Sequence, residues 1–90
     1  MPCETVTIVN EKGLHARASA KFVGMVSQLA DGLDVQVGKD GTRAGGGSIL
    51  GLMMLGAARG DTIEICVDGE NSDAALAKLV GLVKDGFGED

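Results

Sequence analysis

The sequence predicts an α+β fold in which a four-stranded antiparallel sheet carries three helices on one face. Four short segments alternate apolar and polar residues, which is the pattern of half-buried strands. Three other segments space their apolar residues three and four apart, as amphipathic helices do. The stretch Gly38-Lys39-Asp40-Gly41 is typical of a tight hairpin turn, which favours antiparallel pairing. The expected order is β-α-β-β-α-β-α.

The four strands are expected at residues 4–9, 33–37, 42–44 and 62–67. In the first of them, Val6 and Ile8 point to one side while Thr5 and Thr7 point to the other. Clean alternation of this kind indicates a sheet that buries one face and leaves the other in water.

The helices are expected at residues 16–29, at 49–55, and from a cap at Ser72 or Asp73 onward. The first has an apolar stripe of Phe22, Val23, Val26, Leu29 and Ala30. The second follows three glycines, takes Ser48 as its N-cap, and has Ile49, Leu52, Met53 and Leu55 on its apolar side. The third buries Leu76, Leu79, Val80 and Val83.

Length and composition indicate one domain over residues 1–90, with 86–90 as a frayed tail. A net charge of -5 and only two aromatic residues argue against nucleic-acid binding, which needs clustered cations and stacking surfaces. No apolar run approaches the ~20 residues of a membrane span, and no signal peptide is apparent. We therefore expect a cytoplasmic protein.

His15 is the only histidine, and it stands where turn residues give way to the first helix. The first N–H groups of a helix lack internal carbonyl partners and lie at the positive end of its dipole, so an anion binds well there. Lys12, Arg17 and Lys21 surround this position in the sequence. An imidazole so placed can be the nucleophile that forms a covalent phosphoryl intermediate. A lone histidine is more often a plain surface residue, so this assignment depends on the pattern around it.

That pattern is specific. GLHARASAKFV resembles the active-site segment of the HPr family, the histidine phosphocarriers of the bacterial phosphoenolpyruvate-dependent phosphotransferase system (PTS). GSILGLMMLG resembles the segment around the regulatory serine of that family, and the order of strands and helices agrees over the whole chain. The resemblance implies the fold of the family, an open-faced β-sandwich of a four-stranded antiparallel sheet and three helices.

The resemblance also implies roles for individual residues. His15 would accept a phosphoryl group on Nδ1 from phosphorylated enzyme I and pass it to an EIIA-type domain. Arg17 would balance the phosphate charge, and the backbone N–H groups of Ala16, Arg17 and Ala18 would contact the phosphate. Ser48 would be the target of an HPr kinase/phosphorylase. The protein would be a carrier and not an enzyme with its own substrate pocket. We expect a monomer without cofactor or metal.

Ser48 has two interpretations, because a helix N-cap needs no regulatory explanation. A phosphate at a helix N-terminus favours the helix, so phosphorylation would leave the fold intact. It would then act on a docking surface that we expect to include Ile49, Leu50, Met53 and Met54.

Ala18 is a departure from the family, which usually has proline there. Proline suits the first turn of a helix, where its missing N–H would be unpaired anyway. Alanine adds a potential donor beside the phosphate, although neutral drift explains the difference equally well. The assignment of His15 is unaffected.

Cys3 and Cys66 are too few for a disulfide framework, and with a single histidine they suit no metal site. If the first and fourth strands pair antiparallel, as in the family, the two cysteines lie close together on the polar face. A cross-strand disulfide could then form on oxidation, whereas two free thiols are the default in a reducing cytosol.

Two other functions compete with that of a phosphocarrier. A regulatory adaptor of the nitrogen-related PTS branch would bind a kinase or transcription factor under the control of Ser48, but His15 and Arg17 argue against this as the sole role. A small metal- or nucleotide-binding domain is disfavoured because ligand clusters and a P-loop are missing from the sequence. Sugar-uptake and nitrogen-related branches both stay open, and HARAS resembles HPr proteins of alphaproteobacteria.

Overall fold

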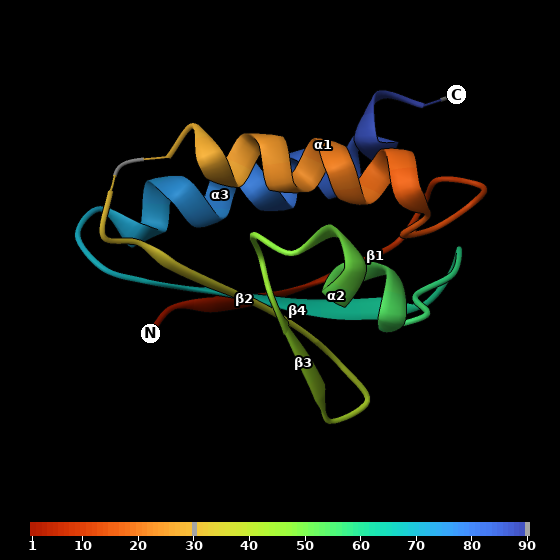
Figure 1. Ribbon diagram of the computed structural model, residues 1–90, viewed down its shortest axis with the longest axis horizontal. Helices are drawn as coiled ribbons and strands as arrows, with labels where there is room; N and C mark the ends of the chain where they lie inside the picture. Colours follow the sequence, from red (N-terminus) through yellow and green to blue (C-terminus); the bar gives the residue numbers. More distant parts are fainter. Residues whose placement is uncertain (30, 90) are drawn as a thin grey trace.

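The computed structural model describes residues 1–29 and 31–89. Its elements are β1 (Cys3–Thr7), α1 (Ala16–Ser27), β2 (Asp34–Lys39), β3 (Thr42–Gly45), α2 (Ile49–Met54), β4 (Thr62–Asp68), α3 (Ser72–Lys84) and a short 3-10 turn η1 (Gly86–Gly88). This order and the antiparallel sheet confirm the predicted fold class (Figure 1). Ala30 of the predicted helical stripe and Asp90 of the predicted tail lie outside the described residues.

The sheet has the strand order β1-β4-β2-β3, and every neighbouring pair is antiparallel. β4 therefore lies inside the sheet, between the N-terminal strand and the β2–β3 hairpin. The hairpin turns at Asp40 and Gly41, both of which have positive φ, as a tight two-residue turn requires. The predicted turn is thus confirmed.

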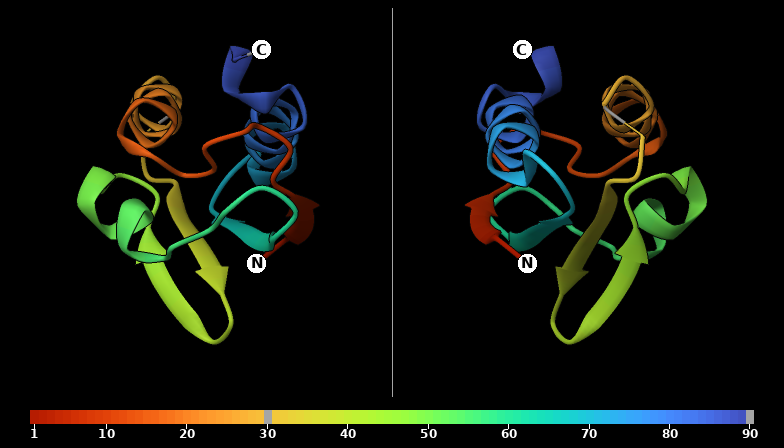
Figure 2. Two further views of the ribbon diagram at one scale, coloured as in Figure 1. Left: turned by 90° about the vertical axis from the view of Figure 1, so that its right-hand side faces the viewer. Right: turned by 90° about the vertical axis from the view of Figure 1, so that its left-hand side faces the viewer.

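Helices α1 and α3 lie side by side over one face of the sheet, and α2 lies beside α1 (Figure 2). Between the helices and the sheet is the core, which includes Phe22 of α1, Leu79 of α3 and Ile65 of β4, all fully buried. Burial of these apolar side chains, at about 25 cal/mol per Å², is the main force that holds the layers together. No helix among the described residues is long and apolar enough to cross a bilayer.

Several element ends differ from the predicted ones. β1 ends at Thr7, yet Ile8 is still paired: its N–H donates to the carbonyl of Asp61, and its own carbonyl accepts from Gly60, both at 2.8 Å. The N-cap of α3 is Asn71, in the left-handed conformation, and neither Ser72 nor Asp73 as predicted. Leu52 of α2 and Leu55, which follows that helix, are buried as expected, whereas Ile49 and Met53 are about 40% exposed.

The frayed tail predicted for 86–90 is wrong for the residues that the structure describes. Gly86–Gly88 form η1, and the side chain of Phe87 is fully buried in the core. The Lys21 ammonium donates to the Phe87 carbonyl at 2.7 Å. Burial of an aromatic ring outweighs the tendency of a glycine-rich terminus to fray.

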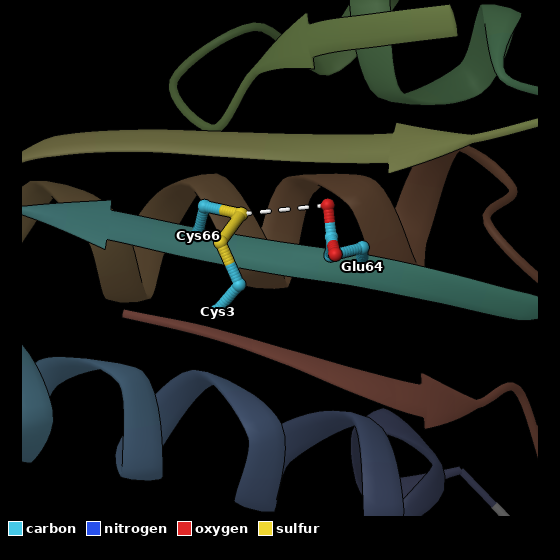
Figure 3. Close-up of side chains that lie close together, drawn as sticks. All are labelled: Cys3, Glu64 and Cys66. Atoms are coloured by element: carbon cyan, nitrogen blue, oxygen red, sulfur yellow. Dashed lines mark hydrogen bonds between the residues drawn. A yellow bond between two sulfur atoms is a disulfide. The ribbon is translucent and has the colours of Figure 1, made fainter. Parts of the chain in front are cut away.

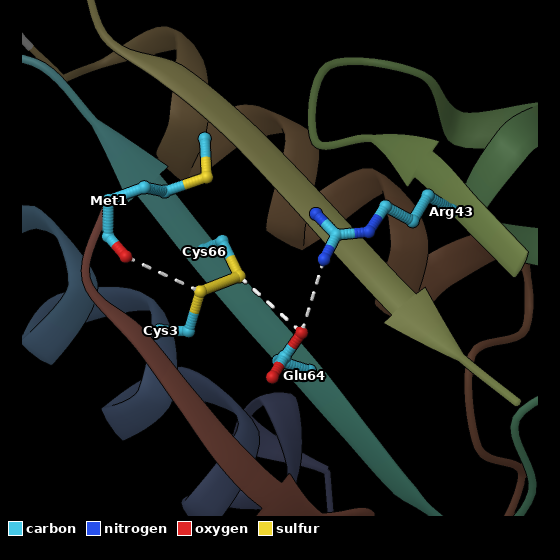
Figure 4. The surroundings of a disulfide bond; sticks show 5 residues. All are labelled: Met1, Cys3, Arg43, Glu64 and Cys66. Carbon is cyan, nitrogen blue, oxygen red and sulfur yellow. Dashed lines mark hydrogen bonds and ion pairs between the residues drawn. A yellow bond between two sulfur atoms is a disulfide. The ribbon is translucent and has the colours of Figure 1, made fainter. Parts of the chain in front are cut away.

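Cys3 and Cys66 are joined by a disulfide that links β1 to β4 (Figures 3 and 4). The two residues are register partners across the strands, with their Cα atoms 4.0 Å apart. Both lie on the face away from the helices, as predicted. Cys66 is nevertheless buried there, because β4 is an inner strand flanked at this position by Cys3 and by Gln36 of β2.

Glu64 lies next to this disulfide (Figure 3). Its carboxylate and the two sulfur atoms are within 4.8 Å of one another, a grouping that could hold a metal ion if the sulfurs were thiolates. In the structure the sulfurs are bonded to each other, and the Glu64 carboxylate instead pairs with Arg43 at 3.4 Å (Figure 4). The cluster is therefore a structural link between strands.

Candidate functional site

Gly13 sets the path of the chain into α1. Its φ is +62°, and a β-carbon there would lie 2.2 Å from the Ala57 carbonyl oxygen. The next residue, Leu14, donates its N–H to that same oxygen at 3.0 Å and buries its side chain in the core. Because only glycine permits this approach, Gly13 fixes the backbone immediately before His15.

His15 is the N-cap residue of α1. Its backbone is extended, with φ −76° and ψ −179°, and its carbonyl accepts the first helical hydrogen bond, from Ser19, at 2.9 Å. Its side chain makes no capping hydrogen bond to the helix backbone. The N–H groups that precede Ser19 in the first turn are those that helix geometry leaves without internal acceptors.

The three first-turn residues expected to contact phosphate differ in exposure. Ala16 and Arg17, the two residues that follow His15, are exposed. Ala18 is fully buried among the core residues. The burial of Ala18 disagrees with its expected contact with phosphate, whereas the exposure of Ala16 and Arg17 is compatible with theirs.

A shallow depression of about 600 Å³ surrounds the His15 ring. Its charged lining consists of Glu11, Lys12, Arg17, Lys21 and Glu89. The three cations singled out in the sequence are thus brought together around the histidine. Within residues 1–29 and 31–89, Arg17 makes no ion pair, so its guanidinium is available to an incoming anion.

Glu89 is a site residue that the sequence analysis missed. Its Oε2 lies 2.7 Å from Nε2 of His15, and its Oε1 accepts a hydrogen bond from the Asn10 side-chain amide at 3.1 Å. The same amide group of Asn10 donates to the Gly13 carbonyl at 2.8 Å, which ties the C-terminal segment to the loop before α1. The sequence feature that could have revealed an ordered C-terminal segment is Phe87, one of only two aromatic residues in the chain. An aromatic side chain is more often packed in the core than exposed.

The surroundings of Glu89 lower the pKa of its carboxyl group. Partial burial acts in the opposite direction and raises this pKa. Hydrogen bonds from Asn10 and His15, together with the charges of His15 and Lys21, outweigh it. The charged form of Glu89 is therefore the stable one in the folded protein.

Ser48 is the N-cap of α2, as predicted, and its Oγ accepts a hydrogen bond from the Gly51 N–H at 3.0 Å. The residues expected at a docking surface are all exposed: Ile49, Leu50, Met53 and Met54, with Leu50 at 68% and Met54 at 76%. They form an apolar patch on the short helix that packs beside α1.

Comparisons with known proteins agree with this fold. A family profile described as "PTS HPr component phosphorylation site" matches residues 3–85. Phosphocarrier protein HPr of Neisseria meningitidis is 44% identical over 86 residues, covering 96% of this chain and 94% of the relative. Phosphocarrier protein NPr of Escherichia coli K12 is 37% identical over 90 residues, covering 97% and 96%. The crystal structure of HPr-C-His from Thermoanaerobacter tengcongensis superposes with a TM-score of 0.91 at 34% identity, covering 100% of this chain and 99% of that one.

The fold is an open antiparallel sheet under three helices. Phosphocarrier proteins match it over nearly its whole length, and this places the chain in the phosphocarrier class. The chain belongs to the HPr family of the phosphotransferase system.

Proposed function

We propose that this protein is a cytoplasmic, monomeric phosphocarrier that accepts a phosphoryl group from phosphorylated enzyme I on His15 and passes it to EIIA-type acceptors. The observation that carries the proposal is the placement of the only imidazole at the N-terminus of α1, in a depression with three cationic side chains. Relatives named HPr and NPr both match the chain, and phosphoryl carriage is the role that both names share.

In the proposed reaction, the lone pair on Nδ1 of His15 attacks phosphorus as the bond from phosphorus to the donor breaks, and the donor keeps that electron pair. The three phosphoryl oxygens then need compensation for their charge. The N–H groups of Ala16 and Arg17 and the guanidinium of Arg17 provide it through charge-assisted hydrogen bonds. Transfer to an acceptor reverses these steps, so His15 is regenerated.

Docking of both partners is assigned to the apolar patch on α2. Ile49, Leu50, Met53 and Met54 are exposed there. Methionine side chains are flexible and polarizable, so one surface can adapt to donors and acceptors of different shape. This property suits a carrier that must meet enzyme I and EIIA-type domains in turn.

Ser48 is proposed as the regulatory site, phosphorylated by an HPr kinase/phosphorylase. Its hydroxyl lies at the start of α2, immediately before the apolar patch. A phosphate of about −2 charge is favourable to the N-terminus of α2 but places new charge on the docking surface. Phosphorylation of Ser48 would therefore slow phosphorylation of His15 without unfolding the protein.

The proposal is tested by reconstituting the relay from phosphoenolpyruvate, enzyme I, this protein and an EIIA-type domain. We expect the EIIA-type domain to be phosphorylated only when this protein is present, at a lower rate with Arg17→Ala and not at all with His15→Ala. Phosphorylation of the EIIA-type domain that proceeds equally well with His15→Ala would contradict the proposed function.

A further inference from the structure

The contact between His15 and Glu89 joins residues 74 positions apart, and it involves only one of the two ring nitrogens. Oε2 of Glu89 lies 2.7 Å from Nε2. An ionised carboxylate can only accept hydrogen bonds, so the proton of this bond belongs to Nε2. In a neutral imidazole the other nitrogen, Nδ1, then holds the lone pair.

We propose that Glu89 is a positioning residue that holds His15 in the Nε2–H tautomer and thereby directs phosphorylation to Nδ1. The inference deepens the proposed function and rests on it for the chemistry at Nδ1, whereas the tautomer itself is independent of any partner. It gives the C-terminal segment a role in the site.

Three attachments hold Glu89 in place. Phe87 is buried in the core, and the Lys21 ammonium donates to its carbonyl at 2.7 Å. The Asn10 amide donates to Oε1 of Glu89, which leaves Oε2 for the ring. The carboxylate is therefore fixed by the fold on both sides of the contact, with side-chain exposures of 27% for His15 and 17% for Glu89.

The plain alternative is a surface ion pair without consequence, since exposed pairs add little to stability. A small free energy is enough to decide a tautomer ratio, because a tenfold change in it corresponds to about 1.4 kcal/mol. A hydrogen bond to a charged acceptor is stronger than one between neutral groups. Glu89 can thus decide the tautomer even where its effect on unfolding is small.

The same arrangement is compatible with the phosphorylated state. When Nδ1 carries the phosphoryl group, Nε2 keeps its proton and the ring becomes cationic. Glu89 can then still accept from Nε2 on the side of the ring away from the phosphate. Arg17, which makes no ion pair within the described residues, remains for the phosphoryl oxygens.

The test uses ring ¹H–¹⁵N correlation spectra, in which the only histidine of the chain gives an unambiguous signal. At a pH where the ring is neutral, we expect the Nε2–H tautomer to dominate in the wild type and the ratio to fall several-fold in Glu89→Ala. Glu89→Gln keeps an acceptor oxygen and should restore part of the preference. Glu11→Ala is the matched control, because Glu11 lines the same depression and has no hydrogen bond to His15 within the described residues.

A second readout is the position of phosphorylation by phosphoramidate, a small donor that needs no partner protein. We expect modification at Nδ1 in the wild type and in Glu11→Ala, and a mixture of Nδ1 and Nε2 adducts in Glu89→Ala. Unchanged tautomer and adduct ratios in Glu89→Ala would overturn the positioning role while leaving the proposed function standing. If the tautomer depends on Glu89 but enzyme I does not phosphorylate the protein, the positioning role is supported and the proposed relay is refuted.

Discussion

Gly13 and Ala57 are in backbone contact: the N–H that follows Gly13 donates to the Ala57 carbonyl, and a β-carbon on Gly13 would stand 2.2 Å from that oxygen. This contact fixes the loop that presents His15. It also joins the start of α1 to the chain segment between α2 and β4, so the site depends on parts of the fold far apart in the sequence.

The substitution Gly13→Ala is expected to destabilise the protein by about 3 kcal/mol. A positive φ costs a residue with a side chain roughly 1–2 kcal/mol, and the clash with Ala57 adds roughly as much again. Denaturant unfolding measures the loss. Gly24→Ala is the control, since Gly24 lies inside α1 with open space around it. This variant protein should be more stable than the wild type by about 0.5–1 kcal/mol. Equal effects of the two substitutions would show that the contact does not constrain the loop.

The part of this site that is local in sequence could be predicted. His15, its cationic neighbours and the helix start lie within a few residues, and the change from a period of two to a period of 3.6 marks the junction. The Ser48 cap was predictable for the same reason. Each depends on interactions within one or two helical turns.

What escaped prediction depends on packing between distant segments. Glu89 reaches His15 only because Phe87 is buried. Glycine flanks Phe87 on both sides, and these glycines led to the prediction of a frayed tail. Burial of Ala18 follows from the way α1 packs on the sheet, which its spacing alone does not determine. The proximity of Cys3 and Cys66 was predicted, but only because the family resemblance supplied the strand pairing.

Substitutions of Ser48 should separate its role as a helix cap from its proposed regulatory role. Ser48→Ala removes the acceptor for the Gly51 N–H and should cost about 1 kcal/mol of stability. Ser48→Asp keeps a capping oxygen and adds a negative charge beside the apolar patch. We expect it to retain wild-type stability and to be phosphorylated several-fold more slowly by enzyme I.

Ser72→Asp is the matched control for Ser48→Asp, because it places the same charge at the start of α3. It should leave the rate of phosphorylation unchanged. An equal slowing by both variants would indicate that net charge, and not the position of Ser48, is responsible.

The disulfide between Cys3 and Cys66 closes a loop with a sequence separation of 63 residues. By the chain-entropy relation, a loop of that length stabilises the fold by about 4 kcal/mol. We expect the oxidised protein to unfold at a higher denaturant concentration than the reduced one, with an intact mass lower by two hydrogens. Cys3→Ser should unfold identically with and without reductant. Identical unfolding of the oxidised and reduced wild type would contradict the estimate.

The attachment of the C-terminal segment that contains Glu89 should weaken at acidic pH. The pKa of Glu89 is lowered on folding, so its ionised form stabilises the docked segment above the ordinary value of 4.5, and this contribution is lost as the pH falls through the lowered folded value. Backbone chemical shifts of Phe87 and Gly88 should therefore show an acid step from Glu89 that lies below about pH 4.5.

In Glu89→Gln this acid step should be absent, whereas Glu11→Gln should retain it. A step of the same size in Glu89→Gln would assign the titration to another group of the depression.

The claim that His15 is the phosphoryl acceptor is tested most directly by intact mass. After incubation with enzyme I and phosphoenolpyruvate, the protein should gain the mass of one phosphoryl group, lose it in acid, and gain nothing when His15 is replaced by alanine. A phosphoryl adduct that survives acid, or one that still forms on His15→Ala, would contradict the account.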